Sequence, residues 1–110
     1  NWQTLGKRYA ESHHVWMLDA RNHGRSPHDP THSYEAMAQD VVDFLDANGL
    51  DKVRLLGHSM GGKTVLLLSQ RHPDRIDKVI VADNFLFGVA QSIRIWPCWM
   101  GYQYICHSTF

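Results

Sequence analysis

One stretch decides the fold of this chain, and it reads Leu55-Leu56-Gly57-His58-Ser59-Met60-Gly61-Gly62-Lys63. The pattern G-x-S-x-G at residues 57–61 is typical of a nucleophile elbow, a sharp turn between a strand and a helix that exposes a serine hydroxyl. Glycine two residues before and two residues after the serine lets the strand and the helix pass close to each other. Ser59 is therefore the candidate nucleophile.

A helix that begins directly after Ser59 brings free backbone N–H groups and its positive dipole end to the place where an oxyanion would form. The backbone N–H of Met60 is the candidate oxyanion donor. The alternative is a glycine-flanked serine at an ordinary strand–helix turn, because so short a pattern can match by chance. The flanking sequence favours the elbow, since residues 52–56 are strand-like and residues 64–68 are helix-like.

The composition excludes several classes of function. The chain has 110 residues, 44% of them hydrophobic and 20% charged, which predicts one small globular domain. Its net charge of zero argues against nucleic acid or a membrane surface as a partner. We find no apolar run long enough to span a bilayer. Cys98 and Cys106 match no metal-binding spacing, and although a disulfide between them is open we assign them no role. We expect no metal and no cofactor.

Charge is distributed unevenly along the chain. Residues 1–84 contain all 11 acidic residues and 10 of the 11 basic ones, whereas residues 85–110 contain only Arg94. The same C-terminal stretch holds Trp96, Trp99, three Phe and two Tyr. This change in composition predicts a core at 1–84 and an atypical tail at 85–110.

Hydrophobic periodicity predicts alternating helices and strands in the first of these parts. Ser33 is a suitable helix N-cap, and Asn48-Gly49 is a suitable left-handed stop for the same helix. The expected helices cover 2–12, 33–48 and 60–71, and the expected strands cover 14–19, 52–58 and 76–82. This order predicts an α/β fold with a parallel, doubly wound sheet and right-handed crossovers. About three strands are present, fewer than an average sheet has, so we expect part of a larger sheet.

A polar loop at residues 21–27 follows the first expected strand. Open α/β sheets place binding loops at this position, just beyond the carboxyl end of a strand. The loop offers no nucleophile and no evident base. We therefore expect Asp19, Arg21 and Ser26 to brace the loop through hydrogen bonds.

Three segments together resemble the alpha/beta-hydrolase fold family: Leu18-Asp19-Ala20-Arg21-Asn22-His23-Gly24-Arg25-Ser26-Pro27, Tyr34-Glu35-Ala36-Met37-Ala38-Gln39-Asp40 and Gly57-His58-Ser59-Met60-Gly61-Gly62-Lys63. The Arg-Asn-His-Gly loop and the Gly-Gly-Lys after the elbow are similar to a branch of small esterases related to alpha/beta-hydrolase domain-containing protein eleven and its bacterial counterparts. The resemblance covers residues 1 to about 84.

The resemblance implies a Ser–His–acid triad that hydrolyses carboxylic esters. Ser59 takes the place of the nucleophile. Asp83 stands at the end of the strand that follows the nucleophile helix, where this branch places the acid. The alternative for Asp83 is a loop aspartate that caps whatever follows.

The catalytic histidine stays unassigned. His58 neighbours Ser59, but adjacent side chains of an elbow point apart, and His23 is a loop residue in the family. His107 is the only histidine after Asp83 and belongs to the atypical tail. The family's strands before Asn1, with the second oxyanion donor, are absent, and the tail is unlike the family. An out-of-frame or non-native segment after residue 84 would explain its composition.

The expected function is serine hydrolysis of acyl esters or lipids, impaired in this chain because a histidine is missing. The alternatives are an inactive truncated fragment or a non-enzymatic binding module, and a thioesterase, haloperoxidase-like or C–C hydrolase activity. The bacterial relatives suggest a cytoplasmic protein, and the animal relatives suggest a mitochondrial one. The oligomeric state stays open.

Overall fold

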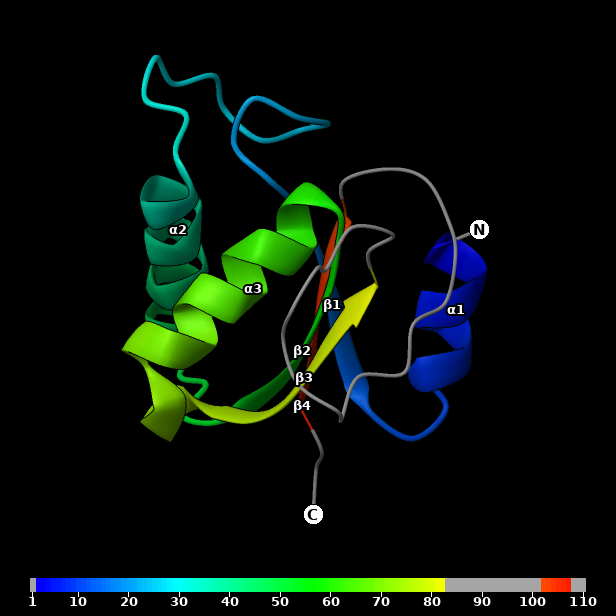
Figure 1. Cartoon of the computed structure of the whole chain (residues 1–110). Coiled ribbons are helices and arrows are strands. Elements are labelled where there is room, and N and C mark those ends of the chain that lie inside the picture. Colours follow the sequence, from blue (N-terminus) through cyan, green and yellow to red (C-terminus); the bar gives the residue numbers. More distant parts are fainter. Residues whose placement is uncertain (1, 83–101, 108–110) are drawn as a thin grey trace.

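A computed structural model describes residues 2–82 and 102–107 of the chain (Figure 1). Its elements, in chain order, are α1 (Trp2–Tyr9), β1 (His14–Asp19), α2 (Tyr34–Ala47), β2 (Val53–His58), α3 (Met60–Arg71), the short 3-10 helix η1 (Pro73–Arg75), β3 (Ile76–Ala82) and β4 (Tyr102–His107). All six elements expected from the periodicity are present. The largest difference is at α1, which ends at Tyr9 where the sequence predicts a helix to residue 12.

Local hydrogen bonds explain the limits of α2. Ser33 has an extended backbone, and its hydroxyl accepts a hydrogen bond from the N–H of Ala36 at 3.1 Å, which confirms the expected N-cap. At the other end Gly49 has a φ of 64°, and the N–H of Leu50 donates to the carbonyl of Leu45 at 2.9 Å. This pattern is a Schellman motif, which requires a left-handed residue at the position of Gly49.

The sheet has the strand order β1-β4-β2-β3. Strands β2 and β3 pair in parallel, whereas β4 is antiparallel to both of its neighbours, β1 and β2. Because β1 and β2 both oppose β4, they run in the same direction. The three expected strands therefore run in the expected direction. The sheet has four strands, however, where the sequence predicted about three. A fourth strand, from the C-terminal tail, lies between β1 and β2.

The physical reason for this difference lies in the tail itself. The α2 crossover carries the chain past one strand position, and an alternation pattern does not say which strands become neighbours. A strand in that position pairs with β1 on one side and with β2 on the other, which satisfies backbone groups of all three. Residues 83–101, which make up most of the remaining tail, lie outside the described residues.

The hydrophobic core lies between the sheet and the helices α2 and α3, which cover the same face of the sheet (Figure 1). Helix α1 lies on the opposite face. The most deeply buried core side chains, each at most 1% exposed, are Leu45, Val53, Leu55, Val65, Leu68 and Val81. Packing of these side chains fixes α3 against β2 and β3, so the turn that joins β2 to α3 has a rigid base on both sides.

Candidate active site

Ser59 lies at the turn between β2 and α3. Its backbone has φ 52° and ψ −115°, a conformation that residues with a side chain rarely adopt. The side chain is exposed, and it makes no capping hydrogen bond to the helix that it precedes. A serine at a helix start normally uses its hydroxyl as a cap. Here the hydroxyl makes no such bond, which agrees with the elbow prediction.

The glycines around Ser59 permit this turn. A Cβ on Gly57 would collide with the backbone carbonyl of Gly61, the second residue of α3. A Cβ on Gly62 would lie 2.8 Å from the side chain of Val81 on β3. Gly57 therefore allows the close approach of strand and helix that the sequence predicts, whereas the tight contact of Gly62 with β3 was not predicted and the role expected of Gly61 stays a prediction.

The first turn of α3 supplies the candidate oxyanion donor. Helix α3 begins at Met60, and its first backbone bond runs from the N–H of Lys63 to the carbonyl of Ser59 at 3.2 Å. The N–H groups that precede Lys63 in the helix have no carbonyl one turn earlier to bind. The N–H of Met60 is among them, and it belongs to the residue next to the candidate nucleophile.

The predicted acid, Asp83, lies outside the described residues. The strand that leads to it is described, and it ends beside the elbow. His58 and Ala82 are register partners at the ends of β2 and β3, and the N–H of Ser59 donates to the carbonyl of Ala82 at 3.1 Å. Ala82, the residue directly before Asp83, is therefore hydrogen-bonded to the candidate nucleophile.

The three histidines considered from the sequence have different surroundings. His58 is 8% exposed, and its ring lies 5.4 Å from the ring of Trp2 on α1, centroid to centroid. Its ring therefore packs on the face of the sheet that α1 covers. The Nδ1 atom of His23 lies 2.9 Å from the carbonyl oxygen of Arg21, within its own loop.

His107 belongs to the opposite end of the sheet from Ser59. In the β1–β4 register Tyr102 pairs with Asp19, whereas His107 pairs with His14. Asp19 ends β1 at the carboxyl edge, the edge at which Ser59 follows β2. Five strand residues at about 3.4 Å each separate His107 from that edge. The register therefore argues against His107 as the base.

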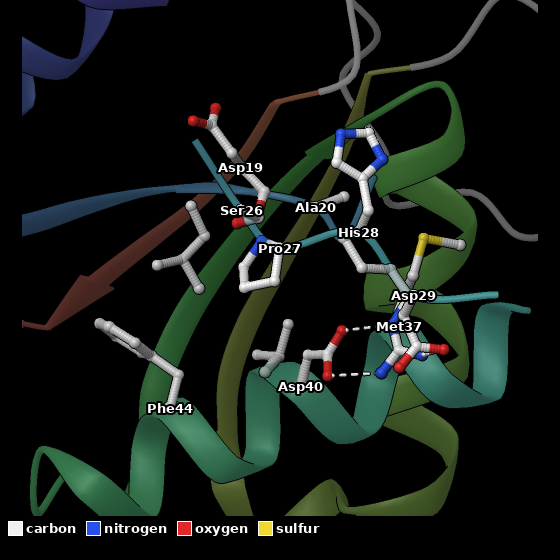
Figure 2. A pocket seen from close by; sticks show the side chains of 12 residues that line it. Asp19, Ala20, Ser26, Pro27, His28, Asp29, Met37, Asp40 and Phe44 are labelled. Carbon is white, nitrogen blue, oxygen red and sulfur yellow. Dashed lines mark hydrogen bonds and ion pairs between the residues drawn. The ribbon is translucent and has the colours of Figure 1, made fainter. Parts of the chain in front are cut away.

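Hydrogen bonds brace the loop after β1, which confirms the role expected of Asp19, Arg21 and Ser26. The Arg21 guanidinium donates two hydrogen bonds of 2.7 Å to the carboxylate of Asp40 on α2, shown as dashed lines at Asp40 in Figure 2. These bonds raise the pKa of Arg21 above its ordinary value. Ser26 donates to the carbonyl of Asp19 at 2.6 Å, and the Asp19 carboxylate accepts from the N–H of Arg25 at 3.0 Å.

Two pockets lie next to this loop, and the sequence indicated neither of them. One has a volume of about 250 Å³ and is lined by His32, Ser33, Tyr34, Glu35, Met37 and Met60. The other, of about 290 Å³, is drawn in Figure 2 and is lined by residues of β1, its loop and α2. Met37 contributes to both linings. The sequence did contain a signal for these pockets. Helix α2 was expected to begin after a loop at the carboxyl edge of the sheet, which brings its first turn to the same edge as the elbow.

The described residues provide no metal site and no membrane span. Residues 2–82 and 102–107 contain no group of three or more His, Cys, Asp or Glu side chains that could hold a metal ion. In the same part of the chain no helix is long and apolar enough to cross a bilayer.

Comparison with known proteins gives the family. A family model described as the alpha/beta hydrolase fold matches residues 1–104. The chain belongs to the alpha/beta hydrolase fold family. The match includes β1, β2 and β3, the elbow and its flanking helices, so the predicted fold class is confirmed.

The relatives of this alpha/beta hydrolase include enzymes named for ester cleavage. It is 48% identical over 83 residues to the esterase YbfF of Escherichia coli, and this match covers 76% of this chain and 33% of that protein. It is 46% identical over 85 residues to the mouse protein named sn-1-specific diacylglycerol lipase ABHD11, with 76% of this chain and 28% of that protein covered. The chain thus spans a third or less of the length of these two relatives.

A solved structure is also similar to this chain. The structure of a marine microorganism esterase matches with a TM-score of 0.58 and 52% identity, over 58% of this chain and 24% of that one. The similarity in sequence and in structure supports the same hydrolase membership, and it concerns only part of each relative.

Proposed function

We propose that the protein hydrolyses carboxylic esters by transferring their acyl group to Ser59. The observation that carries the proposal is the backbone of Ser59, which holds an exposed and uncapped hydroxyl in a strained turn at the start of α3. Strained backbone of this kind is concentrated at functional sites. The relatives named as an esterase and a diacylglycerol lipase support acyl esters, including lipid esters, as the substrate class.

The proposed reaction has two steps. The Oγ atom of Ser59 bonds to the ester carbonyl carbon while a base takes its proton, and the alcohol leaves with that proton. Water then attacks the acyl-serine, releases the carboxylic acid and restores the hydroxyl. The N–H of Met60 donates a hydrogen bond to the carbonyl oxygen as it becomes negative.

Asp83 is the proposed acid, which orients the base and stabilises its protonated form. Its support is the hydrogen bond that joins Ser59 to Ala82, the residue before Asp83. We assign the base to no described histidine. Loss of one triad member lowers the rate by several orders of magnitude but leaves some catalysis. We therefore expect this 110-residue chain to be acylated slowly and to show little turnover. We also propose that the protein is cytoplasmic, as its bacterial relatives suggest.

The test is labelling of the purified chain with a fluorophosphonate, with Ser59→Ala as the matched control. Such a probe reacts with an activated serine and releases fluoride as the Oγ–P bond forms. We expect slow labelling that maps to Ser59 and is lost in the variant. A folded chain that labels no faster than its Ser59→Ala variant would show that the elbow does not activate its serine.

A further inference from the structure

The turn between α2 and β2 contains a pair of residues that is chemically reactive. Asn48 is one of four asparagines in the chain and the only one followed by glycine. Asparagine before glycine is especially prone to deamidation, because glycine has no side chain to shield its backbone nitrogen from the asparagine amide. Both residues are exposed, and among the described residues Gly49 faces open space where a Cβ would be. Solvent therefore reaches this turn.

Deamidation needs no reagent other than water. The backbone nitrogen of Gly49 loses its proton to solvent and bonds to Cγ of Asn48. The Cγ–Nδ2 bond then breaks, and the amide nitrogen takes a proton from solvent and leaves as ammonia. Water cleaves one of the two ring C–N bonds of the resulting succinimide, which gives aspartate or isoaspartate at position 48. In total the chain gains one water and loses one ammonia.

The fold keeps the two reacting groups apart. The N–H of Gly49 donates to the carbonyl of Asp46 at 3.2 Å, and Nδ2 of Asn48 donates to the carbonyl of Phe44 at 2.8 Å. Ring closure requires the nitrogen of Gly49 to be nearly eclipsed with Cβ of Asn48 about the Cα–C bond. The ψ of Asn48 is 5°, which eclipses that nitrogen with the backbone nitrogen of Asn48 instead. The turn must therefore open before Asn48 can react.

A guanidinium from a later part of the chain bridges this turn. Arg75, in η1, donates to the carbonyls of Leu50 and Asp51, each at 2.8 Å. Its Nη1 atom lies 2.9 Å from the carboxylate of Asp46. Asp46 precedes the reactive pair, whereas Leu50 and Asp51 follow it, so one side chain holds both sides of the pair. The Arg75 side chain is 21% exposed, and water therefore competes only in part for these contacts.

We propose that Asn48 is a site of spontaneous deamidation and that Arg75 sets its rate by holding the turn closed. This inference does not depend on the proposed function of Ser59. The product weakens the same turn, because isoaspartate adds a carbon to the backbone between residues 48 and 49. Either product also brings a negative charge to the C-terminal end of α2, where the helix dipole is negative. Opening of the turn thus leaves a permanent mark on the chain.

The experiment follows deamidation of the purified chain at mildly alkaline pH, in buffer and in guanidinium chloride sufficient to unfold it. Mass spectrometry of a peptide that contains residue 48 measures the exchange of ammonia for water, and chromatography separates the aspartate and isoaspartate forms. The folded chain should react at least about tenfold more slowly than the unfolded chain, the scale set by two hydrogen bonds of ordinary strength.

Arg75→Lys tests the role of the guanidinium. Lysine keeps the charge but lacks the planar fork that reaches two carbonyls and a carboxylate at once. The ratio of folded to unfolded rates should rise by about fivefold, the effect of one lost hydrogen bond. Arg71→Lys is the matched control and should leave the ratio unchanged, because Arg71 is 50% exposed and its pair with Glu35 is long, at 3.9 Å.

Asp46→Asn keeps the proposal testable if Arg75→Lys fails to fold. The position is 60% exposed, and the substitution removes the charge that faces Arg75 while it keeps the carbonyl that binds Gly49. It should raise the same ratio by a smaller factor. Equal rates for a folded and an unfolded chain would overturn the protection of Asn48. An unchanged ratio in the folded variants at positions 75 and 46 would overturn the role of Arg75.

Discussion

The backbone of Ser59 has a local energetic cost at the position of the proposed nucleophile. A residue with a side chain in a sparsely populated region of φ and ψ costs about 1–3 kcal/mol. The surrounding packing maintains this conformation, since α3 is held to β2 and β3 by buried side chains such as Val65 and Leu68. If Ser59 served only to make a turn, a residue that adopts this backbone without strain would make the fold more stable.

Ser59→Gly should therefore stabilise the fold while it removes the proposed nucleophile. Glycine adopts a positive φ without strain, and its extra freedom in the unfolded chain offsets about 0.5–1 kcal/mol of that gain. We expect a net increase of about 1 kcal/mol in the free energy of unfolding. Urea denaturation followed by circular dichroism measures it.

The control is Ser69→Gly, in the last turn of α3, where the backbone is helical and the Ser69 hydroxyl donates to the carbonyl of Leu66 at 2.8 Å. Glycine there should lower the free energy of unfolding by about 1 kcal/mol, because it removes this hydrogen bond and has a lower helix propensity than serine. If both glycine variants are destabilised equally, the elbow backbone stores no strain.

At the scale of elements, hydrogen bonds between neighbouring segments add to the sheet pairing. Arg54 on β2 donates to Asp77 on β3 at 2.8 Å, and its guanidinium also lies 3.1 Å from the Nε2 of His13. Arginine only donates, so Nε2 of His13 is the acceptor, and this fixes the tautomer of a neutral ring. The contacts connect the segment before β1 to β2 and β3.

The Arg54–Asp77 pair predicts a dependence of stability on pH. The hydrogen bond from Arg54 lowers the pKa of Asp77 below its ordinary value of 3.8. A carboxylate with a lowered folded-state pKa stabilises the fold above the unfolded-state pKa, and this contribution is lost as pH falls through the folded-state value. The unaltered chain should lose stability below about pH 4 more steeply than Asp77→Asn, by a small margin because both partners are partly exposed.

The measurement is the urea midpoint between pH 7 and pH 2.5. Asp74→Asn serves as the control, since Asp74 is an exposed carboxylate on η1. Its acid profile should follow that of the unaltered chain. Identical profiles for Asp77→Asn and the unaltered chain would show that the pair contributes nothing.

At the scale of the whole molecule, β4 determines whether the sheet is continuous. It pairs with β1 over six register positions and with β2 over four, while β1 and β2 are not paired with each other. The elements that carry the elbow, β2, α3 and β3, form one side of this arrangement, and β1 with its loop forms the other. The second side is joined to the sheet through β4.

Ile105→Pro tests this connection. Ile105 is the register partner of both Trp16 and Leu55, and proline removes a backbone donor from a strand with neighbours on both sides. A lost hydrogen bond is worth about 1 kcal/mol, and more if its partner stays buried, so β1 amides should exchange roughly tenfold faster. Hydrogen exchange resolved by residue measures this, and β3, which pairs with β2 alone, is the internal control. Unchanged exchange in β1 would contradict a sheet joined through β4.

The sequence alone predicted six of the helices and strands and singled out Ser59 as the candidate nucleophile. Spacing of apolar residues placed α2, α3 and the strands β1, β2 and β3 within a few residues, because helix and strand periods differ and the chain has clear caps such as Ser33 and Gly49. The pattern around Ser59 also predicted the sharp turn, because only glycine permits so close an approach of strand and helix.

Only the tertiary structure decided which segments became neighbours. The antiparallel place of β4, the separation of His107 from the elbow and the presence of Met37 in the linings of two pockets all depend on contacts between residues far apart in the chain. Periodicity reports the face that a segment buries, but strand order is set by the pairing of backbone groups, which are the same in every residue except proline. The sequence could therefore identify the serine, and the fold was needed to show what surrounds it.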